Sequence, residues 1–111
     1  MSERPMHQPG NFEKLRAIYA DAEALIADGA YDAAIAKLSE GLAIDDHFRQ
    51  RYVTMYAQRG FAQHHKGAFA AAIADYEKAL VLEAELTHGR LQGLIADCRA
   101  GRGPGDEPLI E

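Results

Sequence analysis

The sequence has no tryptophan, a single cysteine and no long apolar run. Because the lone Cys98 cannot form an internal disulfide, nothing indicates an oxidising compartment. A membrane-spanning helix needs roughly 18–20 consecutive apolar residues, and no stretch of the chain approaches that length. The N-terminal segment MSERPMHQPG also lacks the apolar core of a secretory signal. These absences favour a cytoplasmic protein without a membrane partner.

Positive charge is scarce as well. The chain has 12 Lys and Arg against 17 Asp and Glu, and its net charge is −5 at pH 7. Since nucleic-acid binders draw much of their affinity from a basic face, no nucleic-acid partner is expected. The residues that favour strands are few and alanine is abundant, which favours helices. At 111 residues the chain has the length of one domain.

The spacing of apolar residues predicts an all-α fold of about five helices. Apolar side chains recur every three or four positions over residues 12–28, 32–44, 47–66, 68–85 and 88–100. Asn11, Asp45-Asp46 and Thr87 are the expected N-caps of the first, third and fifth helices. The apolar residues of the third helix occupy more than one face, as in a helix packed on two sides. Short connections make successive helices antiparallel neighbours.

The ends of the chain are expected to lie outside the helical domain. Residues 1–11 form a flexible lead-in, residues 12–101 the domain, and residues 102–111 a flexible acidic tail, because GRGPGDEP cannot hold regular structure. Two alternatives stand for Leu109 and Ile110 in this tail. Either they belong to a disordered ending, or they dock into an apolar groove of the same molecule or of a neighbour.

Two stretches of the chain are similar to each other at a spacing of 38 residues. GAFAAAIADYEKALVLE, which begins at Gly67, repeats the pattern of GAYDAAIAKLSEGLAID, which begins at Gly29. Self-similarity at a fixed spacing is the mark of a repeat protein. The identical pairs are Gly29/Gly67, Ala30/Ala68, Ala33/Ala71, Ala34/Ala72, Ile35/Ile73, Ala36/Ala74 and Leu42/Leu80.

These residues resemble the tetratricopeptide repeat (TPR) family, with two repeats and a C-terminal capping helix over residues 12–101. The family has a large residue, a Leu-Gly pair, an aromatic and, after a Gly-containing turn, Ala, an aromatic, Ala and Pro. In the second repeat these places hold Tyr56, Arg59-Gly60, Gln63, Ala72, Tyr76, Ala79 and Ala84. The resemblance implies close helix contacts at the small residues, with the aromatics filling the space between helices.

Two positions depart from the family's pattern. Arg59 and Gln63 stand where the family has Leu and Tyr. We expect Arg59 to lay its aliphatic stem across the core and to keep its charged head in water.

The resemblance also implies where a partner would bind. Stacked helix pairs form a superhelix whose concave face is lined by the first helix of each pair. A mixed groove with an apolar middle would suit an amphipathic helix or an extended peptide with apolar anchors. The expected partner-binding residues are Arg16, Tyr19, Glu23, Thr54, Phe61, His64, His65, His88, Leu91, Ile95 and Arg99. The Lys, Arg and Asn clamp with which some members bind acidic C-terminal peptides is missing.

No residue pattern points to chemistry, so no catalytic residue, metal ligand or cofactor is expected. His64, His65 and His88 lack the spacings that give strong metal signals, and adjacent histidines on a helix point about 100° apart. We expect solvated histidines at helix ends, where the helix dipole favours a positive charge. Cys98 lies on an apolar stripe, where a free cysteine behaves as a small hydrophobe.

The leading hypothesis is therefore a small, non-catalytic protein-interaction module, an adaptor or chaperone-like protein that binds a partner peptide or helix in its concave groove. A second hypothesis is a self-associating scaffold, a homo-oligomer whose groove is filled by another copy. A third, much weaker, is a metal- or His-dependent enzyme.

Overall fold

The computed structural model describes residues 11–44, 49–82, 89–105 and 109. Within these ranges the chain forms five helices and no strand. They are α1 (Asn11–Ala27), α2 (Tyr31–Leu42), α3 (Arg49–His65), α4 (Phe69–Leu82) and α5 (Arg90–Arg99). The predicted all-α fold of about five helices is confirmed.

At the helix ends that lie within the described residues, the boundaries differ from the predicted ones by one or two residues. Asn11 is the first residue of α1 rather than a cap before it. α5 begins at Arg90, after Gly89 with a φ of 88°. The expected caps Asp45-Asp46 and Thr87 lie outside the described residues.

The helices α1, α3 and α5 end with the same turn. Each is followed by a glycine of left-handed conformation, Gly29 (φ 81°), Gly67 (φ 83°) or Gly101 (φ 75°). In every case the glycine N–H donates to the carbonyl three residues back at 3.0 Å, and the next N–H donates to the carbonyl five residues back at 2.8–2.9 Å. This is the Schellman motif, which requires a residue free of Cβ strain. α5 therefore ends as the first helix of a pair does.

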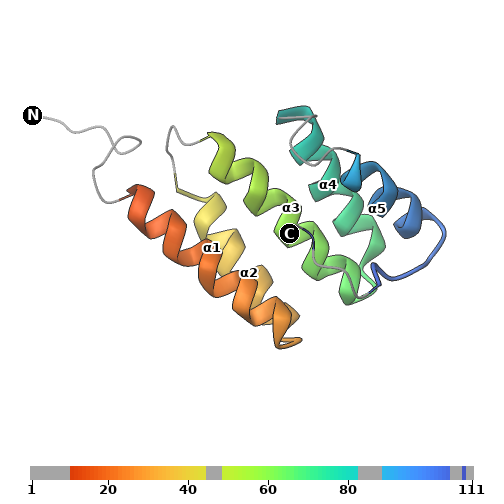
Figure 1. Ribbon diagram of the computed structural model, residues 1–111, viewed down its shortest axis with the longest axis horizontal. Coiled ribbons are helices and arrows are strands. Elements are labelled where there is room, and N and C mark those ends of the chain that lie inside the picture. The colour runs from red at the N-terminus through yellow and green to blue at the C-terminus, as the bar shows by residue number, and fades with distance from the viewer. Residues whose placement is uncertain (1–10, 45–48, 83–88, 106–108, 110–111) are drawn as a thin grey trace, which may run out of the picture.

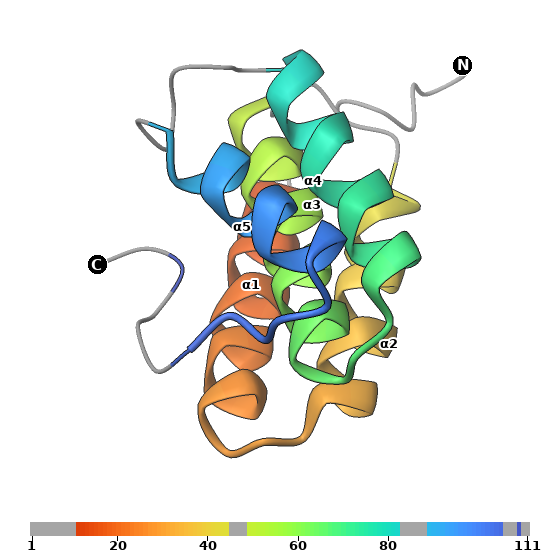
Figure 2. The same cartoon turned by 90° about the vertical axis from the view of Figure 1, so that its right-hand side faces the viewer.

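The helices stand side by side, and each packs against the next along the chain (Figure 1). α1 also contacts α3. Seen from the end, α1 and α5 lie on one side of the molecule, while α2 and α4 lie on the other (Figure 2). The first helices α1 and α5 thus form one face, and the second helices α2 and α4 form the opposite face.

The buried apolar residues form two clusters that meet at α3. The first joins α1, α2 and α3, and consists of Leu15, Ile18, Ala22, Leu38 and Met55. The second joins α3, α4, α5 and the tail, and consists of Val53, Ala57, Phe61, Ala72, Tyr76, Ala79, Leu91, Leu94, Ile95, Cys98 and Leu109. α3 contributes to both clusters, so the prediction of a third helix packed on two sides is confirmed.

A close approach between α3 and α4 depends on a glycine. A Cβ built on Gly60 would lie 2.9 Å from Cδ1 of Tyr76 and 3.1 Å from the carbonyl oxygen of Ala72. The backbone oxygen belongs to α4 and cannot move as a flexible side chain would. Gly60 thus lets the two helices approach closely, as the resemblance implied for this position.

We therefore expect opposite effects from two glycine-to-alanine substitutions. Gly60→Ala gains about 1 kcal/mol of helix propensity but forces α4 away, at about 1–3 kcal/mol, so a net loss of stability of about 1 kcal/mol is expected. Gly93→Ala in α5 meets nothing within 4 Å and should raise stability by about 0.5–1 kcal/mol. Urea unfolding followed by circular dichroism measures both changes. A stabilising Gly60→Ala would contradict the close approach.

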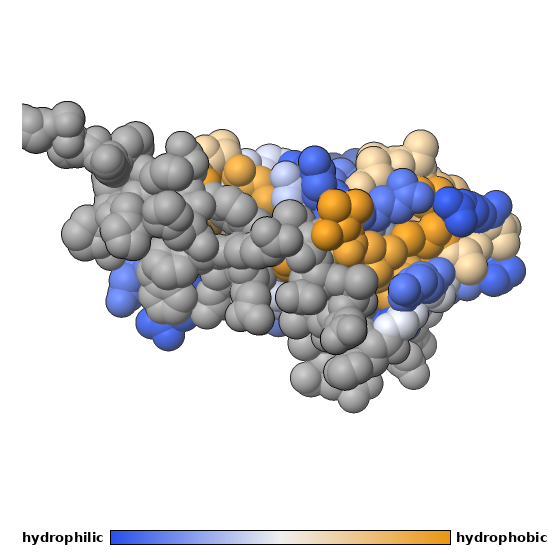
Figure 3. Space-filling view, turned by 90° about the horizontal axis from the view of Figure 1, so that it is seen from above, coloured by the Kyte–Doolittle hydropathy of each residue, from blue (hydrophilic) through white to orange (hydrophobic). Residues whose placement is uncertain are grey.

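Apolar surface gathers over the end of the molecule where α4 and α5 lie (Figure 3). Val81 of α4 is 80% exposed, and Ile73 and Leu80 of the same helix are only partly buried.

In the part of the chain that is described, no helix combines the length and apolar character needed to cross a membrane.

Candidate partner-binding face

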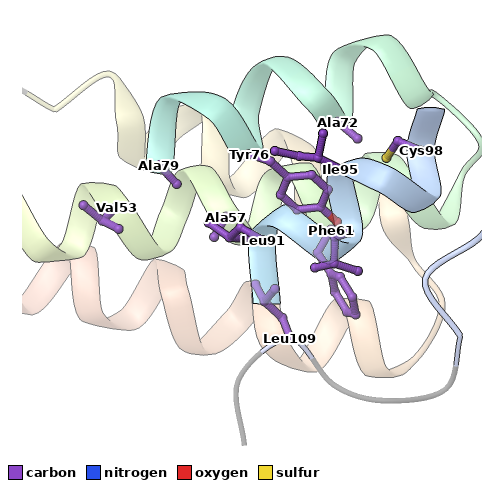
Figure 4. Packing of buried hydrophobic residues seen from close by; sticks show 11 residues of the cluster. Val53, Ala57, Phe61, Ala72, Tyr76, Ala79, Leu91, Ile95, Cys98 and Leu109 are labelled. Atoms are coloured by element: carbon purple, nitrogen blue, oxygen red, sulfur yellow. The ribbon is translucent and has the colours of Figure 1, made fainter. Parts of the chain in front are cut away.

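The C-terminal tail returns to the face formed by the first helices. Leu109 is only 6% exposed and belongs to the second cluster. In Figures 1 and 2 the described part of the tail lies on the side of α1 and α5, and in Figure 4 Leu109 lies beside Leu91. We call this surface the tail-binding face, and define it by Ile26, Ala57, Phe61, Leu91 and Ile95.

The tail-binding face unites residues from three helices. Ala57 and Phe61 come from α3, and Leu91 and Ile95 from α5, all buried, while Ile26 of α1 is half-buried and packs against the cluster. Helical spacing places each pair on one side of its helix. Three of the predicted site residues, Phe61, Leu91 and Ile95, are therefore brought together.

The burial of these residues corrects the expectation of an open groove. Phe61, His64, Leu91 and Ile95 were expected to be accessible to a partner, and each is buried in this structure. The physical reason is that α5 packs down on α3 and α4 and that Leu109 belongs to the same cluster, which removes apolar area from water.

Arg102 and Leu109, two described residues of the tail, contact the helical domain. The backbone of Arg102 is bonded at both its N–H and its carbonyl, and Leu109 is buried. Of the two alternatives for Leu109, docking on an apolar face of the same molecule is the one found. Ile110 lies outside the described residues.

His64 connects the core to the start of the tail. Its side chain is 1% exposed, with Nε2 2.7 Å from the carbonyl oxygen of Arg102 and Nδ1 3.0 Å from the hydroxyl of Tyr76. A carbonyl oxygen only accepts, so Nε2 carries a proton, and in the tautomer with this single ring proton Nδ1 accepts from the hydroxyl of Tyr76. The expectation of a solvated histidine is wrong at this position, because both ring nitrogens have buried partners.

Burial also sets the protonation of Tyr76, which is fully buried. The loss of hydration raises the pKa of this phenol far above its ordinary value of about 10, and the neighbouring Cys98 adds to the shift. The hydroxyl therefore keeps its proton at neutral pH and can donate a hydrogen bond to Nδ1 of His64.

His65 lies at the junction of the two helix pairs. Its ring stacks on Tyr31 with centroids 4.8 Å apart and planes 4° apart, and it meets Phe61 edge-on at 4.8 Å. Nearby, the Lys66 ammonium pairs with the carboxylate of Asp32. These contacts connect the turn after α3 to the start of α2.

The other predicted site residues surround the buried centre or lie away from it. The hydroxyl of Tyr19 accepts a hydrogen bond from Gln58 at 3.3 Å. Arg16 pairs with Glu13 at 3.7 Å and Arg99 with Glu77 at 3.3 Å, both on exposed side chains. Glu23 is exposed and Thr54 half-buried. His88 lies outside the described residues.

A second polar network joins α2, α3 and α4 around Arg59. Its guanidinium donates to both oxygens of Asp75 at 2.7 and 3.0 Å and to the hydroxyl of Ser39 at 2.9 Å. It also lies 5.8 Å from the ring centre of Tyr56. The hydrogen bonds that Arg59 donates to Asp75 raise the pKa of Arg59 further. The head of Arg59 is thus paired, where the sequence predicted that it would stay in water.

Gln63, the second departure from the family's pattern, belongs to the same network. With its amide nitrogen toward α4, it donates to Oδ2 of Asp75 and to the carbonyl of Ala71, each at 3.0 Å. The two departures are therefore one joint feature. Asp75, 6% exposed, is the carboxylate that both of them satisfy.

No set of three or more His, Cys, Asp or Glu side chains among the described residues could hold a metal ion. Burial raises the pKa of the Cys98 thiol, and the carboxylate of Asp97 adds to the shift. The thiol is therefore protonated at neutral pH, which is its unreactive form.

Two groups near the tail-binding face were not among the binding residues predicted from the sequence. Leu109 was left between two alternatives, although a branched aliphatic side chain in an acidic tail is itself a signal of docking. The other is the carbonyl of Arg102, which has no sequence signal because every residue carries one.

With the geometry described, the chain was compared with known proteins. No protein-family model matches it, and no curated protein or solved structure matches it either.

Proposed function

We propose that this protein is a non-catalytic interaction module that binds an extended partner segment on its tail-binding face. The segment inserts one branched aliphatic side chain where Leu109 now lies. The module is a TPR-like repeat, and its partner is a protein or peptide, as an adaptor or chaperone-like protein requires.

The observation that carries the proposal is the burial of Leu109. Leu109 lies in one cluster with residues of three helices and is only 6% exposed. Burying a leucine is worth about 1.5–3 kcal/mol relative to leaving it exposed. The face therefore has the chemistry of an anchor site, in which an aliphatic side chain supplies most of the affinity.

Self-association is the rival proposal, in which another copy fills the same face. Leu109 occupies the face within one chain, so this observation favours the interaction module over the scaffold. Light scattering separates the two. A mass that grows with protein concentration in the micromolar range would support self-association.

The experiment uses a fluorescent peptide Gly-Asp-Glu-Pro-Leu-Ile-Glu, the sequence of residues 105–111. Fluorescence anisotropy should show saturable binding to the full chain, and the same peptide with Ser in place of Leu should not bind. Absence of binding by the Leu peptide would refute the proposal.

Two neighbouring residues of α1 provide a matched pair of variants. Ile26→Ala removes methyl groups from the tail-binding face and should weaken peptide binding roughly three- to tenfold. Leu25 is also half-buried but belongs to neither cluster of the described residues, so Leu25→Ala should leave the affinity unchanged. Equal losses in both variants would place the peptide elsewhere.

A further inference from the structure

We infer that the tail is a tethered competitor of the partner, so that a partner segment binds only after it displaces Leu109. This inference rests on the proposed function and adds its regulation. The face is then covered by the tail in most molecules, and its apparent affinity for a partner depends on the fraction of molecules from which the tail has left.

The start of the tail is fixed to the domain at Arg102. Its N–H donates to the carbonyl of Asp97 at 2.8 Å and closes the Schellman turn of α5. Its carbonyl accepts from Nε2 of His64 at 2.7 Å, and its guanidinium donates to Asp97 Oδ1 at 2.9 Å. Arg102 is thus held by its N–H, its carbonyl and its side chain.

The residues that follow the turn at Gly101 determine the direction in which the tail leaves α5. After Gly29 and Gly67 the chain enters another helix within two residues. After Gly101 it continues as Arg102-Gly103-Pro104-Gly105, where two glycines and a proline prevent a helix, and Gly105 has a φ of 82°. The tail therefore crosses to the first-helix face instead of forming a second helix on the opposite one.

The short tether makes the tail a strong competitor. Leu109 lies seven positions after Arg102, and the mean end-to-end distance expected for a linker of that length is roughly 15 Å. Short tethers give effective concentrations in the millimolar range. The tail of a second copy, at micromolar concentration, is present at about a thousandth of that level. Docking within one chain is therefore favoured over exchange between copies.

The loss of affinity that the tail causes for a partner can be calculated from the fraction of molecules whose face is open. An apparent dissociation constant equals the intrinsic one divided by the fraction of molecules whose face is open. Burial of one leucine, reduced by the ordering of the tether, corresponds to an open fraction on the order of one tenth. A partner segment must bring at least an equal aliphatic anchor to bind.

The test compares three full-length variants with the wild type, using the same fluorescent peptide. Leu109→Ala releases the tail and should bind the peptide on the order of tenfold more tightly than the wild type. Leu109→Ile keeps an anchor and should retain the wild-type affinity. Val81→Ala shortens an aliphatic side chain that is 80% exposed and should also match the wild type.

The outcomes distinguish this inference from the proposed function. If all four proteins bind with the same affinity, the tail is no competitor, while the proposed function stands. If none binds, the proposed function fails and the inference fails with it. Dimers at micromolar concentration in light scattering would overturn docking within one chain.

A second measurement needs no substitution and serves even if Leu109→Ala fails to fold. In the isotope-labelled wild type, the methyl resonances of Leu109 report directly on its surroundings. Saturation with unlabelled peptide should shift them to the values of a solvent-exposed leucine. Peptide binding that leaves these resonances in place would overturn the inference.

Discussion

Replacement of Tyr76 by alanine is expected to lower the free energy of unfolding by about 3–5 kcal/mol, the largest effect of any single substitution considered. Tyr76 is fully buried and is the largest of the side chains that are so completely covered. Removing an aromatic ring from such a site costs its transfer free energy and leaves a cavity. Urea unfolding followed by circular dichroism measures the change. A loss below about 1 kcal/mol would contradict the central packing role of this residue.

Tyr76→Phe removes only the hydroxyl, and the contribution of this hydroxyl to the free energy of unfolding should depend on pH. At pH 7 the variant should be less stable by about 1–2 kcal/mol, because Nδ1 of His64 loses its donor in a buried site. Since burial raises the pKa of Tyr76 in the folded state, the unfolded chain loses this proton first as the pH rises. The stabilisation is complete below pH 10 and declines above it.

The measurement is the difference in stability between wild type and Tyr76→Phe at pH 9, 10 and 11. Only the wild type carries the Tyr76 proton, so the difference should shrink by about 1 kcal/mol between pH 10 and 11. The other tyrosines and Cys98 titrate in both proteins and cancel. A difference that stays constant over this range would show that the hydroxyl ionises as freely in the folded as in the unfolded chain.

The helices and their turns were predictable because their causes are local. Apolar spacing decides which side of a helix is buried, and a glycine after α1 and α3 supplies the left-handed turn that ends each of them. The position of Gly60 was predictable for a similar reason, since a small residue at that place in a helix pair allows close approach. Only the exact first and last residues of the helices differed.

The candidate site was predictable only in part. The resemblance to a repeat family implied that Phe61, Leu91 and Ile95 share a face, and the structure brings them together. Their burial was not predictable, because it depends on how α5 packs in the second cluster and on the position of Leu109. His64 shows the limit most clearly: its partner, the carbonyl of Arg102, is 38 residues away and has no sequence signature.

The Arg59–Asp75 pair carries the second large prediction. Removing one member of a buried ion pair leaves the other without compensation, at about 3–5 kcal/mol. The side chain of Asp75 is 9% exposed and that of Arg59 23%, so solvent reduces this cost to about 2–4 kcal/mol for Arg59→Met or Asp75→Leu. Chemical denaturation of the two single variants measures both losses. The exposed pair Lys37–Asp21, at 3.8 Å, is the control, and Lys37→Ala should cost less than about 1 kcal/mol.

The double variant Arg59→Met/Asp75→Leu tests whether the ion pair stabilises the fold more than apolar packing would. Apolar replacement of a whole buried pair is often neutral or stabilising, so the double variant should be more stable than either single one. The coupling energy of this cycle should exceed about 1 kcal/mol. Additive losses would contradict a direct interaction between the two charges. Recovery in the double variant would mean that the pair substitutes for ordinary apolar packing between α3 and α4.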